Sequence, residues 1–225
     1  MGGWDSDAGR GGGILNYSGT AEVSHSLIYK NSGGEDSGQG YVIGGDGGGI
    51  CNYYDGKLTI TNSTISGNST KEGWPNFGGG GICNYHIALI ESCTITGNRS
   101  YGNGGGICAD PYSVHTANLQ TTTKIHNTII ANNTFVPSPY IKGNDCSGKI
   151  ISLGYNLIKD TAGCTIDGSA AGNIYNLDPK LASLADNGGP TRTHELSPNS
   201  PAIDTGDPQD FEETDQRGGL RPKDG

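Results

Sequence analysis

Acidic residues at alternating positions are the first group in this chain whose type and spacing could bind a metal ion. Asp5 and Asp7 flank one serine, and Asp46 lies directly before a run of glycines. Carboxylate oxygens are ligands that Ca²⁺ prefers, although the closing glutamate of an EF-hand loop does not follow them. Acidic residues in loops more often simply face solvent. That explanation is the alternative to a calcium site at Asp5, Asp7 or Asp46. The same choice applies to a group near the end of the chain: Asp204, Asp207 and Asp210.

Basic residues and histidines are the second group with chemical potential. A polysaccharide lyase needs a base beside a charge neutraliser, and a glycoside hydrolase needs clustered carboxylates. His25 and His126 fall in equivalent strands of the repeats described below, but the coils between them carry Asn62 and Glu91. We therefore expect both histidines to be solvent-facing side chains of a pleated sheet. The sequence indicates no catalytic residue and no cofactor other than the calcium ion considered above.

Three cysteines occupy one slot of a repeat. Cys51, Cys83 and Cys108 each follow the repeat isoleucine, where the first copy has Leu15. Because free cysteine behaves as a small apolar residue, this pattern favours a buried ladder of stacked side chains. Neighbouring coils about 4.8 Å apart would also allow one disulfide within the ladder. A metal site there is less expected, because no histidine or second cysteine lies at ligand spacing.

The element that must position these residues is a repeat of the form Gly-Gly-Gly-Ile-x-Asn. Each copy is followed by a β-branched stretch and then by a second anchor of the form Ile-x-x-Asn. A repeat of this length predicts a solenoid, since one unit cannot bury its apolar face alone. The copies begin at residues 11, 47, 79 and 104, the last with Ala109 in place of the asparagine, and the second anchors end at Asn31, Asn68, Asn98 and Asn132.

Each unit reads as three short strands, because its segments alternate with period two and glycine, 40 of 225 residues, disfavours helix. Parallel crossovers are nearly always right-handed. The sequence therefore predicts an all-β, right-handed, single-stranded parallel β-helix of about five coils over residues 1–175. Inward side chains are expected at Ile50, Leu58, Ile60, Ile65, Ile82, Leu89 and Ile95.

Asparagines are expected at the bends of this helix. There the residue tolerates the left-handed conformation, and its amide can bond the next coil. The predicted bend residues are Asn16, Asn52, Asn84, Asn31, Asn68, Asn98 and Asn132.

The composition of the chain limits the classes of partner that it could bind. A net charge of −9 argues against nucleic acid, because phosphate binding needs basic patches. The chain holds no run of 18 consecutive apolar residues, so we expect no membrane insertion in this segment. The Thr-, Ser- and Asn-rich strands suit a polysaccharide partner, and copies of the chain itself are the alternative partner.

The Gly-Gly-Gly-Ile-x-Asn repeat resembles those of chlamydial polymorphic outer-membrane proteins. The stretches 145–164, 176–207 and 214–222 resemble the ending of bacterial β-helix proteins of the choice-of-anchor Q domain type. This resemblance implies a secreted or surface-attached bacterial protein. Cys146 and Cys164 flank one strand and turn inside the resembling region, and a disulfide between them is the strongest pairing in the chain. It would fit an oxidising compartment.

Residues 176–225 are expected to leave the regular helix and pack as an irregular cap or side flap, because prolines interrupt them. A pair between Asp215 and Arg217 or Arg221 would lock this tail across the last coil. Three functional classes follow. The favoured one is an extracellular structural or adhesive protein with weak glycan binding; the others are a polysaccharide lyase or hydrolase and a filament subunit that stacks end to end.

Overall fold

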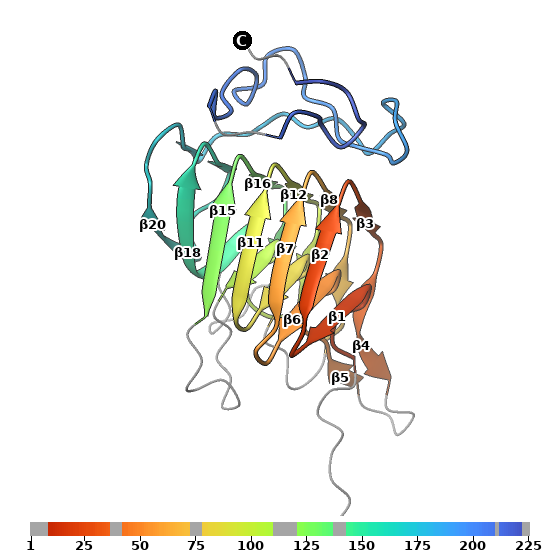
Figure 1. Ribbon diagram of the computed structural model, residues 1–225. Coiled ribbons are helices and arrows are strands. Elements are labelled where there is room, and N and C mark those ends of the chain that lie inside the picture. Colours follow the sequence, from red (N-terminus) through yellow and green to blue (C-terminus); the bar gives the residue numbers. More distant parts are fainter. Residues whose placement is uncertain are drawn as a thin grey trace, which may run out of the picture.

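The chain winds into a parallel β-solenoid with three principal strands in each coil and about five coils. The computed structural model describes residues 9–36, 42–72, 78–109, 121–136, 143–209 and 212–221. These residues contain strands, turns and no helix, so no helix among them could cross a membrane. The predicted all-β, coil-stacked architecture is confirmed, and Figure 1 shows the strands of successive coils side by side.

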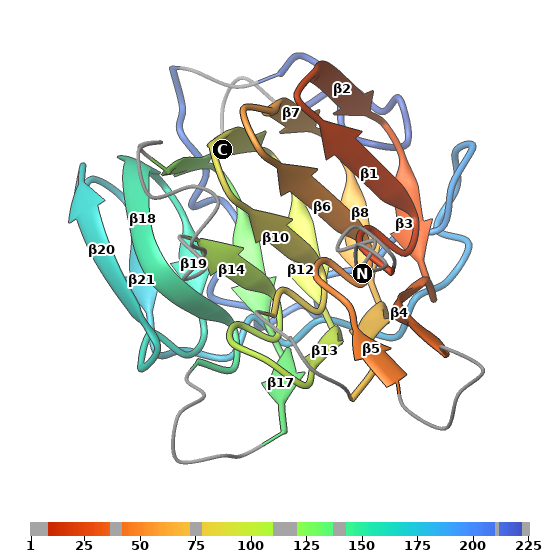
Figure 2. The same cartoon turned by 90° about the horizontal axis from the view of Figure 1, so that it is seen from below.

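Sheet A stacks one strand from each coil in parallel (Figure 2). Its strands are β1 (Ile14–Tyr17), β6 (Ile50–Tyr53), β10 (Ile82–Asn84), β14 (Ile107–Ala109) and the start of β18 (Cys146–Gly154). Sheet B follows along the chain, and β18 runs from sheet A into it. Its other strands are β2 (Thr20–Ser24), β7 (Lys57–Thr61), β11 (Ile87–Glu91), β15 (Thr122–His126) and β20 (Cys164–Gly168).

Sheet C completes each coil. It consists of β3 (Leu27–Tyr29), β8 (Thr64–Ser66), β12 (Thr94–Thr96), β16 (Ile129–Ala131), β19 (Leu157–Ile158) and β21 (Ile174–Tyr175). A short fourth ladder leads back toward sheet A, with β5 pairing antiparallel to β4 at its edge. Its members are β4 (Ser32–Asp36), β5 (Val42–Gly44), β9 (Ser69–Thr70), β13 (Arg99–Ser100) and β17 (Thr134–Phe135).

The glycine triplets of the repeat turn the chain into sheet A. The first glycine of the second copy, Gly47, has φ +70°, a backbone conformation that residues with a side chain rarely adopt. The next glycine, Gly48, lies so close to the coil below that a Cβ atom would come within 2.4 Å of the Gly80 carbonyl oxygen. The triplet is therefore needed both for the bend and for the close approach of coils.

The core is a column of isoleucines inside the coils. Ile50, Ile82 and Ile107 stack in sheet A, each with an exposed fraction of 0 %. The predicted inward position of Leu89 is wrong. In β11 it is Ala88 and Ile90 that are buried, in register with Leu58 and Ile60 of the preceding coil, so Leu89 faces outward.

Two asparagine ladders hold the coils together. In the first, the side-chain amide of Asn16 donates to Asn52 and that of Asn52 donates to Asn84, both over 2.7 Å. In the second, the amide nitrogens of Asn31, Asn68 and Asn98 each donate to the oxygen of the next coil's residue over 2.9 to 3.0 Å. Buried amides are thus satisfied by their own stack, as burial of polar groups requires.

The second ladder corrects the predicted role of Asn132. The asparagine that occupies the ladder position in this coil is Asn133, whose side-chain amide donates to a carboxylate oxygen of Asp145 at 2.9 Å. Asn132 precedes it at a bend with φ +61°, as predicted for a bend asparagine, but its side chain is exposed and lies outside the ladder. The expected left-handed conformation at the ladder asparagines is also wrong: in the neighbouring coils the residue before the ladder position, Gly67 or Gly97, adopts it.

After β21 the chain forms only isolated bridges. This C-terminal segment (residues 176–221) turns back and runs along the side of the solenoid, over the corner between sheets B and C (Figure 1). It therefore takes the side-flap arrangement rather than an end cap. Cys146 and Cys164 form a disulfide that joins β18 to β20, as predicted.

Candidate functional site

The outer face of sheet A carries a column of tyrosines. Tyr17 lies in register with Tyr53, and the ring of Tyr85 in the next coil meets that of Tyr53 edge to face, with centroids 4.9 Å apart. Tyr53 and Tyr85 are buried, whereas Tyr17 is 50 % exposed. Tyr54 has φ +56° at the corner toward sheet B and is 43 % exposed. Its ring stacks on that of Tyr17, with centroids 5.7 Å apart and planes inclined by 8°.

Beneath the exposed pair lies a buried ion pair. The Arg10 guanidinium sits 3.8 Å from the centre of the Tyr53 ring, and its Nε lies 3.5 Å from an Asp46 carboxylate oxygen. The Tyr85 hydroxyl donates to the same oxygen over 2.7 Å. Asp46 is thus committed to two protein partners. The other calcium candidates, Asp5 and Asp7, lie outside the described residues, as does Asp210.

Two groups of this cluster, Tyr85 and Arg10, have shifted pKa values. Burial, the Cys83 thiol and the Asp46 carboxylate raise the pKa of Tyr85 far above its ordinary value. Burial alone would lower the pKa of Arg10, but its bond to Tyr53 and the charge of Asp46 outweigh burial and raise it. With these shifts the Tyr85 hydroxyl stays protonated and the Arg10 guanidinium stays charged near pH 7, so both groups suit a structural pairing with Asp46.

The three predicted ladder cysteines do stack. Cys51, Cys83 and Cys108 pair in register on the outer side of sheet A, each exposed by 1 % or less, and all three are free thiols. Burial raises the pKa of Cys83 well above its ordinary value, as do the hydrogen bonds with the two neighbouring thiols. Cys93 is also buried, and burial raises its pKa to about 12. Thiols in this state are poor nucleophiles.

The second candidate region lies under the C-terminal segment, which is held by side chains from several coils. Arg221 donates to the side chains of Asn62 at 2.6 Å and Ser92 at 3.0 Å. Gln216 accepts from Thr64 at 2.6 Å and donates to the Ser26 carbonyl at 3.1 Å. These hydrogen bonds attach the segment to the turns between sheets B and C and to sheet C.

The predicted lock of Asp215, Arg217 and Arg221 takes a different form. Arg217 pairs with Asp215 inside one turn, with its Nε 2.8 Å from the carboxylate. Arg221 reaches the second and third coils, as the bonds to Asn62 and Ser92 show, and does not reach the last coil. The expectation that an Arg–Asp pair crosses the last coil is therefore wrong, because the segment runs back along the solenoid.

His126 is buried beneath this segment, at 6 % exposure, which contradicts the expected solvent-facing position. Its Nε2 lies 3.3 Å from an Asp207 carboxylate oxygen and its Nδ1 3.9 Å from Glu91. His25 is not equivalent to it: His126 pairs with Glu91, whereas His25 occupies the turn position shared with Asn62. The backbone N–H of Asp207 also donates to Asn127, at 2.8 Å.

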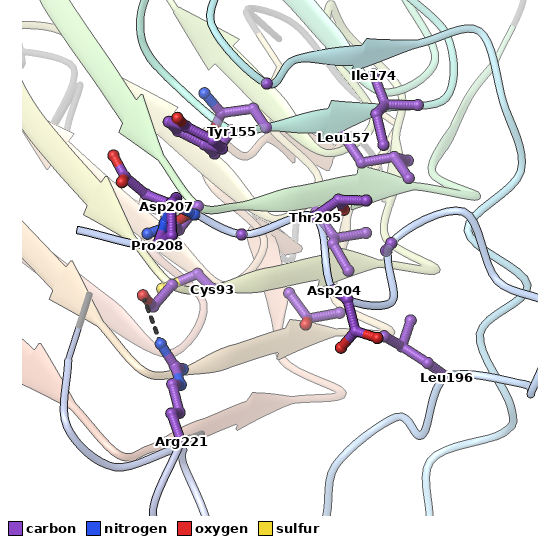
Figure 3. Close-up of a pocket in the computed structure, with 18 residues that line it drawn as sticks. Cys93, Tyr155, Leu157, Ile174, Leu196, Asp204, Thr205, Asp207, Pro208 and Arg221 are labelled. Atoms are coloured by element: carbon purple, nitrogen blue, oxygen red, sulfur yellow. Dashed lines mark hydrogen bonds between the residues drawn. The ribbon is translucent and has the colours of Figure 1, made fainter. Parts of the chain in front are cut away.

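A cavity of about 420 Å³ opens next to these contacts (Figure 3). Its floor is the outer face of sheet C, where Ile129, Leu157 and Ile174 stand in register with Thr64 and Thr94 of the second and third coils. Leu196 and Ala202 of the C-terminal segment lie opposite. The polar lining includes Tyr155, Asp204, Asp207 and Arg221. Among the described residues, no three His, Cys, Asp or Glu side chains converge as a metal site would require.

No protein-family model, curated protein or solved structure matches this chain.

Sequence reasoning missed the tyrosines, Asn133, Asp145 and the cavity. The tyrosines had a visible signal, since the first three copies of the repeat each continue Asn-Tyr: Asn16-Tyr17, Asn52-Tyr53 and Asn84-Tyr85. The cavity had none, because it forms between segments with no repeating relation.

Proposed function

We propose that this chain is an extracellular β-helix protein that binds neutral glycan chains without cleaving them. The observation that carries the proposal is the exposed, stacked pair of Tyr17 and Tyr54. An aromatic ring has a negatively charged face, and the C–H groups of a sugar ring pack against such faces. Large aromatic side chains clustered in the open mark an interaction surface.

The surroundings of the pair suit a sugar chain. Asp55 and Lys57 follow Tyr54 in the chain, and both are exposed, as is Thr20, which pairs with Lys57 in sheet B. These side chains offer donors and acceptors to hydroxyl groups beside the aromatic faces. The surface is open, so it would accept the interior of a long sugar chain. We propose binding without cleavage because an open surface does not exclude water from a reacting bond.

Two further observations agree with an extracellular setting. The Cys146–Cys164 disulfide suits an oxidising compartment. The resemblance of the repeats and of the C-terminal motifs to bacterial surface proteins points the same way. Net charge −9 favours a neutral over an anionic polysaccharide.

The test is a panel of soluble neutral polysaccharides, measured by isothermal titration calorimetry against the wild type, Tyr17→Ala and Tyr54→Ala. Each substitution should weaken binding by about 1 kcal/mol, or roughly fivefold in Kd. Tyr175→Ala is the matched control, because Tyr175 is also exposed, at 36 %, but lies in sheet C. Binding that survives both tyrosine substitutions, or new reducing or unsaturated ends in the polysaccharide, would contradict the proposal.

Self-association is the second candidate. At one end of the solenoid, β1, β2 and β3 each pair with one strand only among the described residues. Edges of this kind can pair with another chain, and a head-to-tail contact would build a filament. Sedimentation velocity over a hundredfold range of concentration would show growing species if this occurs and a constant monomer if it does not.

A further inference from the structure

The cavity under the C-terminal segment has no role in the tyrosine surface. It opens at the corner of sheets B and C, whereas Tyr17 and Tyr54 lie at the corner of sheets A and B. Its volume of about 420 Å³ falls within the range of small-molecule sites in proteins. It is therefore a separate candidate for ligand binding.

The apolar part of the cavity is built by three consecutive coils. The second and third coils present Thr64 and Thr94 at the first outward position of sheet C and the first coil presents Leu27, whereas the three later coils present Ile129, Leu157 and Ile174. An apolar floor of this kind suits a ligand with one apolar face. Figure 3 shows Leu157 and Ile174 on one side of the cavity, with Leu196 across from them.

The polar part of the cavity carries both signs of charge. Asp204, Asp207 and Arg221 all come from the C-terminal segment, and Figure 3 shows Arg221 apart from both carboxylates. Tyr155 lies beside Asp207. A fully charged ligand would meet a like charge on one side of this cavity. A neutral ligand whose hydroxyl groups both donate and accept would satisfy carboxylates and guanidinium alike.

We propose that this cavity binds the terminal one or two sugar rings of a neutral glycan, with the apolar ring face on Leu157 and Ile174 and the hydroxyl groups on Asp204 and Arg221. This inference rests on the proposed function, since it assigns the chain end of the same class of ligand to a second site. The tyrosine pair binds the interior of a chain, and the cavity binds its end.

The experiment uses the full chain and small probes. Methyl glycosides of glucose, galactose and mannose, N-acetylglucosamine, and the disaccharides maltose and cellobiose are titrated by ligand-observed NMR and calorimetry. At least one probe should bind at a single site, and longer oligomers of that sugar should gain no more than twofold over the disaccharide in the Tyr17→Ala/Tyr54→Ala background. Continued gain with length in that background would contradict the proposal.

Two variants locate the binding. Asp204→Asn should weaken the probe at least tenfold, because a hydroxyl loses a charged acceptor. Asn tolerates the φ of +55° at this position, so the variant keeps the backbone. Ile174→Trp fills the cavity and should abolish binding. The double variant Tyr17→Ala/Tyr54→Ala should bind the small probes as the wild type does.

The outcomes separate the two proposals. If the tyrosine variants lose polysaccharide binding while Asp204→Asn and Ile174→Trp leave every probe unchanged, the cavity proposal is wrong and the glycan function stands. If no probe and no polysaccharide binds the wild type, both proposals fail. If the tyrosine variants weaken polysaccharide binding and Asp204→Asn weakens the small probes, both proposals stand.

Discussion

Asp145 should make the solenoid less stable as the pH rises from 4 to 7. Its side chain ends the second asparagine ladder, where one carboxylate oxygen accepts from the backbone and side-chain amides of Asn133, both at 2.9 Å. The other oxygen accepts from the backbone N–H of Asp160, also at 2.9 Å. Burial raises the pKa of Asp145 to about 6 from an ordinary 3.8, against the effect of these donors.

The sign of the pH effect follows from this pKa. Between pH 3.8 and about 6 the folded chain holds a proton that the unfolded chain has lost, so the free energy of unfolding falls as the pH rises. A rise of roughly two in the pKa corresponds to about 3 kcal/mol. That stability is present in full at acid pH and is lost above the folded pKa.

Asp145→Asn tests this reasoning, because the amide is a neutral isostere of the protonated acid. The protonated acid and the amide each place a hydrogen-bond donor opposite the backbone N–H of Asp160. The variant should therefore lie within about 1 kcal/mol of the wild type at pH 4. At pH 7.5 it should be more stable by up to about 3 kcal/mol. Urea unfolding followed by circular dichroism at half-unit steps from pH 4 to 8 measures both curves.

The control is Asp178→Asn, since Asp178 is exposed, pairs with Lys159, and has a pKa below its ordinary value. That variant should not gain stability at neutral pH. A wild type with no fall between pH 4 and 6.5, or an Asp145→Asn curve parallel to it, would refute the argument that burial outweighs the three donors.

Two other predictions concern the ladder and the disulfide. Asn68→Ala should cost about 2 to 4 kcal/mol in urea unfolding, because it leaves buried partners in two coils unsatisfied. Asn132→Ala, an exposed control two coils away, should cost only about 1 kcal/mol for the left-handed backbone, and Asn132→Gly should restore it. Replacing both Cys146 and Cys164 by serine should cost about 3 kcal/mol for a loop of 18 residues, measured with and without reductant in the wild type; equal stability would show that the crosslink constrains nothing.

The repeat made the fold predictable because every copy repeats the same three physical requirements: a glycine with positive φ, an inward isoleucine and a stacked amide. The errors fall where the pattern is ambiguous. Asn132 and Asn133 are adjacent, so spacing alone could not choose between them. Ile87 to Ile90 is apolar throughout, so alternation could not tell whether Leu89 or Ala88 faces inward.

The C-terminal segment was predictable only as irregular. Its position depends on single contacts such as Arg221 to Asn62 and Asp207 to His126, between residues 159 and 81 positions apart. Contacts of that kind have no periodic signature, so neither the burial of His126 nor the cavity beside it could be read from the chain.

The asparagine ladder has a direction, which bears on how such a protein can lengthen. Each amide accepts through oxygen from the coil before it and donates through nitrogen to the coil after it. A duplicated coil inserted anywhere before Asn133 would join this chain of donors without loss. Asp145 as a carboxylate only accepts, so it cannot pass the chain on to a further coil. One side chain thus ends this ladder, and a duplicated coil could extend the ladder upstream of Asp145 but not beyond it.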